Sequence, residues 1–375
     1  MNCNAFFEVL KEAGVGFFAG VPDSLLKDFC AYVTDNTTER EHIITANEGS
    51  AISLAAGNYL GNGGVGLVYM QNSGLGNTVN PLTSLTDNEV YGIPMLLMVG
   101  WRGEPGVKDE PQHVKMGEVT LQTLAAIDIH TEVLPDNLEE AAACVRKAVA
   151  KTLAEKQPVA LVVRKGTFEK YSLQSKRPEP FQMTREEAIG HFVASLPKNP
   201  LIVSTTGKPS RELFELREQR GEDHDGDFLT VGCMGHSSQI ALGVALANPD
   251  RSVYCLDGDG AVLMHMGGLA TIASLAPSNY RHVVLNNGAH DSVGGQPTVG
   301  FSIDIPAIAK ACGYRHAESV DGEHAIADAL ERLNAASGPA LLEIKVCTGA
   351  RADLGRPTMT PRELKERFMA FAEKS

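Results

Sequence analysis

The sequence lacks the features that mark membrane, secreted and nucleic-acid-binding proteins. No apolar run approaches the roughly 20 residues of a membrane-spanning helix, and the N-terminal residues MNCNAFFEVLKEAG predict an amphipathic helix rather than a signal peptide. The seven cysteines form no Cys-x-x-Cys pair, which argues against a zinc site or a disulfide framework. Long basic blocks are absent too, and a net charge of -13 disfavours nucleic acid and anionic membranes as partners. We therefore expect a cytoplasmic protein whose partners are small molecules.

Short apolar runs alternate with helical patterns along the whole chain. Such alternation predicts the α/β class, with parallel sheets covered by helices on both sides, in a doubly wound arrangement. The predicted strands are VGFFAG, HIITA, GLVYM, MLLMVG and ALVVR in the first half, and LIVST, SVYCL, HVVL and ALLEIKV in the second.

Length and composition predict two domains. A chain of 375 residues exceeds the usual size of one core. Between residues 171 and 183 the sequence YSLQSKRPEPFQM has two prolines and little apolar periodicity, which is typical of a linker. We predict a first domain over residues 1–172, a linker over 173–183 and a second domain over 184–375. Both halves open on a helix, a strand and a proline–serine turn, a faint internal repeat.

Two polar motifs follow predicted strands in the second half. They are Gly258-Asp259-Gly260-Ala261 and Asn286-Asn287-Gly288-Ala289. The carboxyl ends of parallel strands meet at one edge of a sheet, where ligands bind, and carboxylate, amide and carbonyl oxygens are the ligands that Mg²⁺ prefers. Either motif alone is a common turn between a strand and a helix. Together they predict a magnesium site that is open to phosphate oxygens, with a helix beginning near Ala261.

This pair of motifs resembles the signature of thiamine diphosphate-dependent enzymes. The resemblance implies that Asp259, Asn287 and the carbonyl oxygen of Ala289 hold the Mg²⁺ that anchors the cofactor diphosphate. Ala261 departs from the pattern, because many members have serine there, and this puts one contact with the diphosphate in doubt. The resemblance also implies two domains of similar topology, one for the pyrimidine ring and one for the diphosphate. The chain has no room for the middle domain of many members.

Glu48 is the candidate catalytic acid. It precedes the predicted helix SAISLAAGNYLG, and a glutamate in a first helical turn can simply complement the helix dipole. The segment also resembles the family stretch that carries the cofactor-activating glutamate. The resemblance implies an apolar pocket that raises the pKa of Glu48, so that it shares a proton with the pyrimidine nitrogen N1′. No protein side chain then needs to act as the nucleophile.

The remaining cofactor contacts also follow from the resemblance. The segment TVGCMGHSS, residues 230–238, is similar to the family stretch that bends the cofactor, and Met234 falls on the position of the apolar wedge. Core packing is the alternative for this methionine. Asn72 and Ser73 are expected to approach the pyrimidine from another subunit, which implies a homo-oligomer, at least a dimer. The implied cofactor-binding set is Asn72, Ser73, Gly207, Gly232, Met234, Gly235, His236, Gly258, Asp259, Gly260, Ala261 and Asn287.

Four segments, residues 20–27, 101–117, 286–298 and 349–358, resemble the phosphonopyruvate decarboxylase family. The implied reaction converts 3-phosphonopyruvate to phosphonoacetaldehyde and carbon dioxide. Asp23 and His113 resemble the acid/base groups of related decarboxylases; a helix N-cap and an ordinary loop residue are the respective alternatives. A phosphonate dianion needs local positive charge, although surface basic residues are usually just solvated. The substrate-binding candidates are Ser24, Arg102, Lys108, Arg351 and Arg356.

Other functions fit the sequence less well. Sulfopyruvate decarboxylases share the Gly-Val-Pro-Asp-Ser opening but are often divided into two subunits, so an undivided chain favours the phosphonate enzyme. A non-catalytic thiamine diphosphate-binding subunit is a further alternative, and Glu48 argues against it. A dinucleotide-binding fold needs a third glycine that both Gly74-Leu-Gly76 and Gly258-Asp-Gly260 lack. In a phosphate-binding P-loop, serine or threonine would stand where Pro209 follows Gly207-Lys208.

Overall fold

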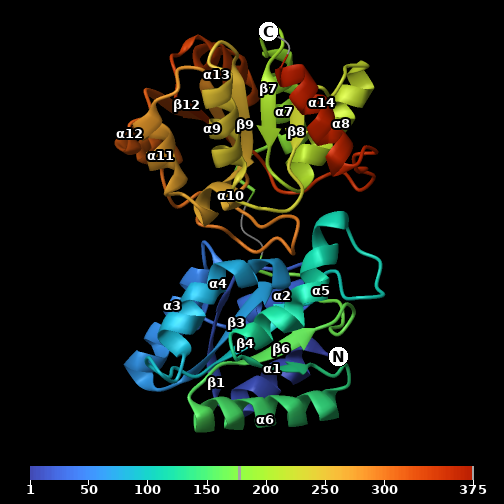
Figure 1. Ribbon diagram of the computed structural model, residues 1–375, viewed down its shortest axis with the longest axis vertical. Coiled ribbons are helices and arrows are strands. Elements are labelled where there is room, and N and C mark those ends of the chain that lie inside the picture. The colour runs from blue at the N-terminus through green and yellow to red at the C-terminus, as the bar shows by residue number, and fades with distance from the viewer. Residues whose placement is uncertain (176–178, 374–375) are drawn as a thin grey trace. The chain divides into compact units, whose positions relative to one another are not determined.

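The computed structural model describes residues 1–175 and 179–373 (Figure 1). By its internal contacts the chain divides into two compact units, Met1–Arg177 with Ser292–Gln296, and Pro178–Asp291 with Pro297–Ser375. Residues 176–178 of the predicted linker lie outside the described residues. Among the described helices, none combines the length and the apolar character needed to span a bilayer.

The first unit is built on a six-stranded parallel sheet with helices on both faces. Neighbouring residues of one strand serve opposite faces, since Phe18 packs in the core beneath α1, α2 and α6, whereas Phe17 packs in the core beneath α3. The strand order is β2 (His42–Ile44), β1 (Val15–Gly20), β3 (Val65–Gln71), β4 (Met95–Gly100), β6 (Val159–Val163) and β5 (His130–Val133). The helices are α1 (Cys3–Glu12), α2 (Lys27–Asn36), α3 (Glu48–Asn62), α4 (Leu75–Pro81), α5 (Pro111–Ala126) and α6 (Leu138–Glu155), with the short turns η1 (Asn72–Gly74) and η2 (Leu82–Thr86).

The second unit repeats this plan. Its parallel strands lie in the order β11 (His316–Val320), β12 (Ala340–Lys345), β10 (Tyr280–Asn286), β9 (Val253–Gly258), β7 (Leu201–Ser204) and β8 (Asp227–Leu229). The helices are α7 (Arg185–Ala194), α8 (Lys208–Arg220), α9 (Ser237–Ala247), α10 (Asp259–Met264), α11 (Gly268–Leu275), α12 (Ile305–Cys312), α13 (Glu323–Ala335) and α14 (Pro361–Ala372). Figure 1 shows helices on both sides of the central strands β7 and β9.

The two sheets have the same topology. When the strands of each unit are numbered along the chain, both sheets read second, first, third, fourth, sixth, fifth. All strand pairs in both sheets are parallel, so the carboxyl ends of the central strands lie along one edge of each sheet. The predicted fold class, two doubly wound domains of similar topology, is confirmed.

The strands predicted from the sequence do not include three edge strands, β5, β8 and β11. Each pairs on one side only, and each carries charged or polar residues such as Glu132 or Glu318, so none forms a continuous apolar run. The helix expected near Ala261 begins two residues earlier, at Asp259. That shift places the aspartate itself in the first helical turn.

Candidate active site

The edge of the second sheet gathers the residues that were predicted to hold a cation. β9 and β10 pair directly, with Gly258 opposite Leu285. Asp259 and Asn287 follow these strands, and the Asn287 backbone donates a hydrogen bond to the Asp259 carboxylate. Both side chains are buried, with 3% and 7% of their surface exposed. A buried carboxylate and a buried amide side chain therefore follow the carboxyl ends of two neighbouring central strands.

Burial sets the protonation of Asp259. Burial raises the pKa of this carboxyl to about 6, although hydrogen bonds from Thr298 and from the backbone at Asn287 and Gly260 act to lower it. Among the described residues, no basic side chain forms an ion pair with it. A buried carboxylate without a positive partner is costly, and a bound divalent cation removes that cost. The predicted ligands, which are this carboxylate, the Asn287 amide oxygen and the Ala289 carbonyl, are all hard oxygen donors of the kind that Mg²⁺ prefers.

A tight turn between β8 and α9 packs against the same edge. Gly232, Cys233 and Gly235 adopt left-handed backbone, with φ angles of 68°, 52° and 83°. A Cβ atom at Gly235 would lie 3.1 Å from the carbonyl oxygen of Ala261. Only glycine permits this close approach to α10 at a positive φ.

Met234, in this turn, lies over Gly260. A Cβ atom at Gly260 would come within 3.2 Å of Met234 Cε and 3.4 Å of a ring carbon of His290, so the missing side chain leaves room between them. The carboxyl ends of β7 to β10 carry all the cofactor residues predicted for this unit: Gly207, Gly232, Met234, Gly235, His236, Gly258, Asp259, Gly260, Ala261 and Asn287.

In the first unit, Asp23 lies buried at the carboxyl ends of β1, β3 and β4. Gln71 Nε2 donates to its Oδ1 at 2.8 Å, and the Leu25 amide donates to its Oδ2 at 2.9 Å. A Cβ atom at Gly100 would collide with Oδ2, which explains glycine at the end of β4. Burial raises the pKa of Asp23, which favours its protonated form. The N-cap interpretation is wrong, since the N-cap of α2 is Leu26.

Arg102 follows β4 and is joined to the Asp23 segment. Its Nη1 donates to Ser24 Oγ at 2.7 Å, and its Nε donates to Asp109 Oδ2 at 2.7 Å in a two-pronged pair. Asp109 also accepts from the Gly103 amide at 2.8 Å. Pairing with Arg102 lowers the pKa of Asp109, so the guanidinium is fixed in place by a charged partner.

His113 lies in α5 with 8% of its surface exposed, so the interpretation as an ordinary loop residue is wrong. Burial, and then the charge of Arg102, lower its pKa to about 4, which leaves a neutral ring at neutral pH. Its Nδ1 is buried without a hydrogen-bond partner. Asn72 Nδ2 donates to the Arg102 carbonyl at 2.7 Å, and Ser73 Oγ donates to Gln71 Oε1 at 2.8 Å. Both predicted pyrimidine contacts thus also support the Asp23 and Arg102 segments.

Glu48 is the first residue of α3, which is capped by Asn47 accepting from the Ser50 amide at 2.9 Å. Its carboxylate is buried, and Oε2 accepts from Asn77 Nδ2 at 2.7 Å. A Cβ atom at Gly74 would lie 2.3 Å from Oε1, so glycine at this position makes room for the acid. The surroundings are therefore mixed, with a polar amide on one side. A groove of about 750 Å³ opens beside this helix start, between α3 and the α4–η2 segment.

Comparison with known proteins places the chain in a family. Family models for the N-terminal and C-terminal TPP binding domains of thiamine pyrophosphate enzymes match residues 3–125 and 211–344. Phosphonopyruvate decarboxylase of Streptomyces viridochromogenes is 39% identical over 96% of this chain and 92% of its own. The chain belongs to the thiamine pyrophosphate enzymes. Phosphonopyruvate decarboxylase of Streptomyces hygroscopicus is also 39% identical, over 97% of this chain and 92% of its own.

Sulfopyruvate decarboxylase of Methanosarcina acetivorans is more distant, at 29% identity over 96% of this chain and 95% of its own. That relative is undivided, so an undivided chain does not separate the two kinds of thiamine pyrophosphate enzyme. The difference in identity does favour the phosphonate branch.

The predicted phosphonate ligands of this thiamine pyrophosphate enzyme differ in their surroundings. Ser24 and Arg102 lie together, as described above. Lys108 and Arg356 are exposed. Arg351 contacts three carboxylates, at 3.0 Å from Glu186, 3.3 Å from Asp353 and also Glu215, so its charge is already balanced.

Sequence reasoning missed the residues that hold the site residues in place. Gln71 and Asp109 in the first unit and Thr298 in the second each donate to or accept from a predicted site residue. All three lie within or next to segments that resemble the family. Their positions in the sequence do not show which side chain each of them contacts.

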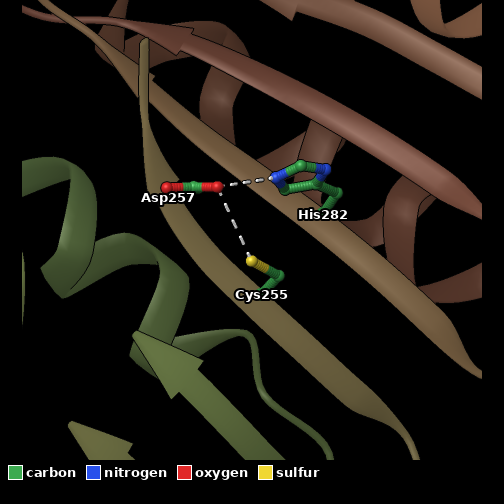
Figure 2. Close-up of side chains that lie close together, drawn as sticks. All are labelled: Cys255, Asp257 and His282. Carbon is green, nitrogen blue, oxygen red and sulfur yellow. Dashed lines mark hydrogen bonds and ion pairs between the residues drawn. The ribbon is translucent and has the colours of Figure 1, made fainter. Parts of the chain in front are cut away.

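Cys255, Asp257 and His282 form a buried polar cluster on β9 and β10 (Figure 2). The cysteine thiol and a ring nitrogen of the histidine both face Asp257 Oδ2, at 3.9 and 3.4 Å. The other oxygen, Oδ1, accepts from the Gly258 amide at 3.0 Å. The donor atoms lie within 4.8 Å of one another, a separation that a metal ion could bridge. Their internal hydrogen bonds already account for this spacing, and they tie the cluster to the cofactor-binding turn.

Proposed function

We propose that this protein decarboxylates 3-phosphonopyruvate to phosphonoacetaldehyde and carbon dioxide, using thiamine diphosphate that is anchored through Mg²⁺. Asp259 carries the cofactor half of the proposal, because it is a buried carboxylate without a basic partner next to Asn287. The relatives carry the substrate half, with 39% identity to two phosphonopyruvate decarboxylases against 29% to a sulfopyruvate decarboxylase.

The residues of the second unit bind and orient. Asp259, Asn287 and the Ala289 carbonyl would hold Mg²⁺, and the glycines around Asp259 would let phosphate oxygens reach the backbone. Met234, which covers Gly260, would separate the two cofactor rings. When bound, thiamine diphosphate supplies a carbon nucleophile and accepts the electrons that carbon dioxide leaves behind.

The residues of the first unit hold and move protons. Glu48 would hold a proton at its carboxyl, opposite the cofactor nitrogen N1′, while Asn77 fixes the other carboxyl oxygen. Asp23, with its raised pKa, would give a proton to the product carbon after carbon dioxide leaves. His113 has a neutral ring at neutral pH and a buried Nδ1 without a partner among the described residues, so it would form a hydrogen bond with the substrate and help to orient it.

Arg102 and Ser24 would bind the phosphonate group. The Arg102 guanidinium is held by Asp109, but it retains N–H groups that point to Ser24. A planar guanidinium beside a hydroxyl suits a tetrahedral dianion, and a phosphonate carries more negative charge than a sulfonate.

The protein would act as a homodimer or a larger assembly in the cytoplasm. Glu48 and Asp259 belong to different units, and the family resemblance implies that one subunit's first unit meets its neighbour's second. The groove beside α3, which Leu54 and Leu85 line together with polar residues, is a candidate contact surface. Free cysteines at all seven positions suit a reducing compartment.

Parallel assays with three 2-oxo acids test the proposal. The purified protein is given Mg²⁺ and thiamine diphosphate, and carbon dioxide release is measured with phosphonopyruvate, sulfopyruvate and pyruvate. We expect kcat/KM for phosphonopyruvate to exceed that for sulfopyruvate at least about tenfold, because one additional charge-assisted contact is lost with the sulfonate. The reverse order would make this a sulfopyruvate decarboxylase. Cofactor binding without any turnover would make it a binding subunit.

A further inference from the structure

The Asp259 carboxylate of the second unit accepts a hydrogen bond from a residue that is not among the predicted cation or cofactor ligands. Thr298 Oγ1 donates to Asp259 Oδ2. The same hydroxyl oxygen accepts from the Gly300 amide at 3.0 Å, so its single proton is directed to the carboxylate. Thr298 has 6% of its surface exposed. The hydroxyl therefore has one fixed orientation in a dry environment.

The backbone around Thr298 is also fixed. Its amide donates to the Gly288 carbonyl at 2.9 Å, immediately after the Asn286-Asn287 pair. Ala289 and Pro297, the next pair toward the loop, form an antiparallel bridge. The two ends of the segment 288–298 are thereby joined, and Thr298 faces Asp259 from the returning end.

Asn286 completes this arrangement. It is fully buried, and its Nδ2 donates to Glu343 Oε1 at 2.7 Å and to the Gly300 carbonyl at 2.9 Å. Its Oδ1 accepts from the Gly288 amide at 3.0 Å. Both the amide nitrogen and the oxygen of the first asparagine therefore have partners within the protein. Asn287 Oδ1 accepts one hydrogen bond, from the Ala289 amide at 3.2 Å, and keeps a second lone pair for a cation.

Gly300 shows how closely the backbone approaches the carboxylate. A Cβ atom there would lie 2.6 Å from Asp259 Oδ2 and 2.7 Å from Asn286 Oδ1. The oxygen that Thr298 holds is therefore enclosed by protein on two sides.

We propose that Thr298 is a positioning residue for the cation: it fixes one oxygen of Asp259 so that the carboxylate presents its other oxygen to Mg²⁺. This inference rests on the proposed function, since it assumes that Asp259 is a metal ligand. Groups that orient a metal ligand typically change metal affinity by about 10- to 100-fold when they are removed. If the Thr298 hydroxyl is removed, Asp259 Oδ2 loses this hydrogen bond, and the carboxylate can rotate away from the orientation that favours Mg²⁺.

Magnesium titrations of cofactor binding test the assignment. The Mg²⁺ concentration that gives half-maximal thiamine diphosphate binding is measured by calorimetry for the wild-type protein and for Thr298→Val, which keeps the shape but loses the hydroxyl. We expect about a tenfold higher concentration for Thr298→Val, and a value near wild type for Thr298→Ser. Thr152→Val, which removes an equally buried hydroxyl in the first unit, is expected to leave the value unchanged.

A second variant covers a failure of Thr298→Val to fold. Gly300→Ala removes no hydrogen-bonding side chain but places a methyl group against Asp259 Oδ2, and we expect the same loss of Mg²⁺ affinity. Wild-type Mg²⁺ dependence in Thr298→Val or in Gly300→Ala would overturn the positioning role. Thiamine diphosphate binding that needs no Mg²⁺ in the wild-type protein would instead overturn the proposed cation site, and the inference with it.

Discussion

The two sheets share one strand order, yet the residues that follow matching strands differ in kind. In the second unit the third and fourth strands, β9 and β10, lead to Asp259 and Asn287, and no basic side chain within the described part of the chain pairs with the carboxylate. In the first unit the third and fourth strands, β3 and β4, lead to an amide-rich turn and to Arg102, which is paired with Asp109. The edge of the second unit presents a buried carboxylate, and the edge of the first unit presents a guanidinium whose position a carboxylate fixes.

The second strands make the same point. β2 leads to Glu48 at the start of α3, and β8 leads to Met234 before α9. Topologically equivalent connections thus carry an acid in one unit and an apolar thioether in the other. A doubly wound sheet supplies the edge, and the loop residues decide which part of a ligand binds there.

The largest expected effect comes from Glu48. The Glu48→Gln protein keeps the hydrogen bond from Asn77 but cannot share a proton, so we expect turnover to fall by about 100-fold or more with little change in thiamine diphosphate affinity. Steady-state assays and calorimetry measure the two quantities. Glu118→Gln on the exposed face of α5 is the matched control. Equal losses of turnover and cofactor affinity would make Glu48 a structural residue.

Asp259→Asn tests the opposite edge. We expect at least about a tenfold loss of Mg²⁺-dependent cofactor binding, because a charged ligand is removed. Without Mg²⁺ the same variant should be more stable than wild type at pH 8, by about 1–3 kcal/mol, since burial raises the pKa of this carboxyl to about 6 and its ionised form is unfavourable. Urea unfolding measures the change. A lower free energy of unfolding for the variant would show that the carboxylate stabilises the folded state instead of destabilising it.

Arg102→Lys sharpens the first-unit side of the comparison. Lysine keeps the charge but loses the two-pronged bond to Asp109, so we expect KM for phosphonopyruvate to rise about tenfold with kcat little changed. The control is Lys108→Gln, which removes a nearby exposed charge and should leave KM unaffected. If Lys108→Gln raises KM as much, the exposed lysine shares in substrate binding.

The smallest effect concerns acid stability. The pKa of His113 falls from 6.5 to about 4 on folding, so the folded state binds fewer protons than the unfolded state in this range. The free energy of unfolding is therefore unaffected by the titration of His113 above pH 6.5, and it decreases as the pH falls from 6.5 toward 4 because the unfolded state binds the proton more readily. Asp259 has the opposite sign, because its raised pKa relieves a cost as the pH falls from 6. The urea midpoint of His113→Gln should therefore drop less than that of wild type between pH 7 and pH 5; an equal drop would refute a buried neutral histidine.

Sequence patterns predicted the fold class and the family, and they selected the strand ends that carry the site. They did so because hydrophobic periodicity and turn residues indicate which strand a residue follows, and because ligands bind at the carboxyl edge of parallel sheets. The same patterns missed β5, β8 and β11, since a strand paired on one side does not need a continuous apolar run.

The supporting partners were out of reach for a different reason. Thr298 and Asp259 are 39 positions apart, and Gln71 and Asp23 are 48 apart. Each contact depends on the path of a loop at the edge of the sheet, and the spacing of residues along the chain does not predict that path. Arg351 is a further example, because its place in a resembling segment does not show that three carboxylates surround it.

Complementation between two inactive variants tests most directly whether the two units divide the work across subunits. Glu48→Gln and Asp259→Asn proteins are co-expressed with different affinity tags, and mixed dimers are isolated through both tags. If a first unit acts on cofactor held by its neighbour's second unit, each mixed dimer has one intact site, and we expect about half of wild-type turnover. Mixed dimers as inactive as either parent would contradict the account.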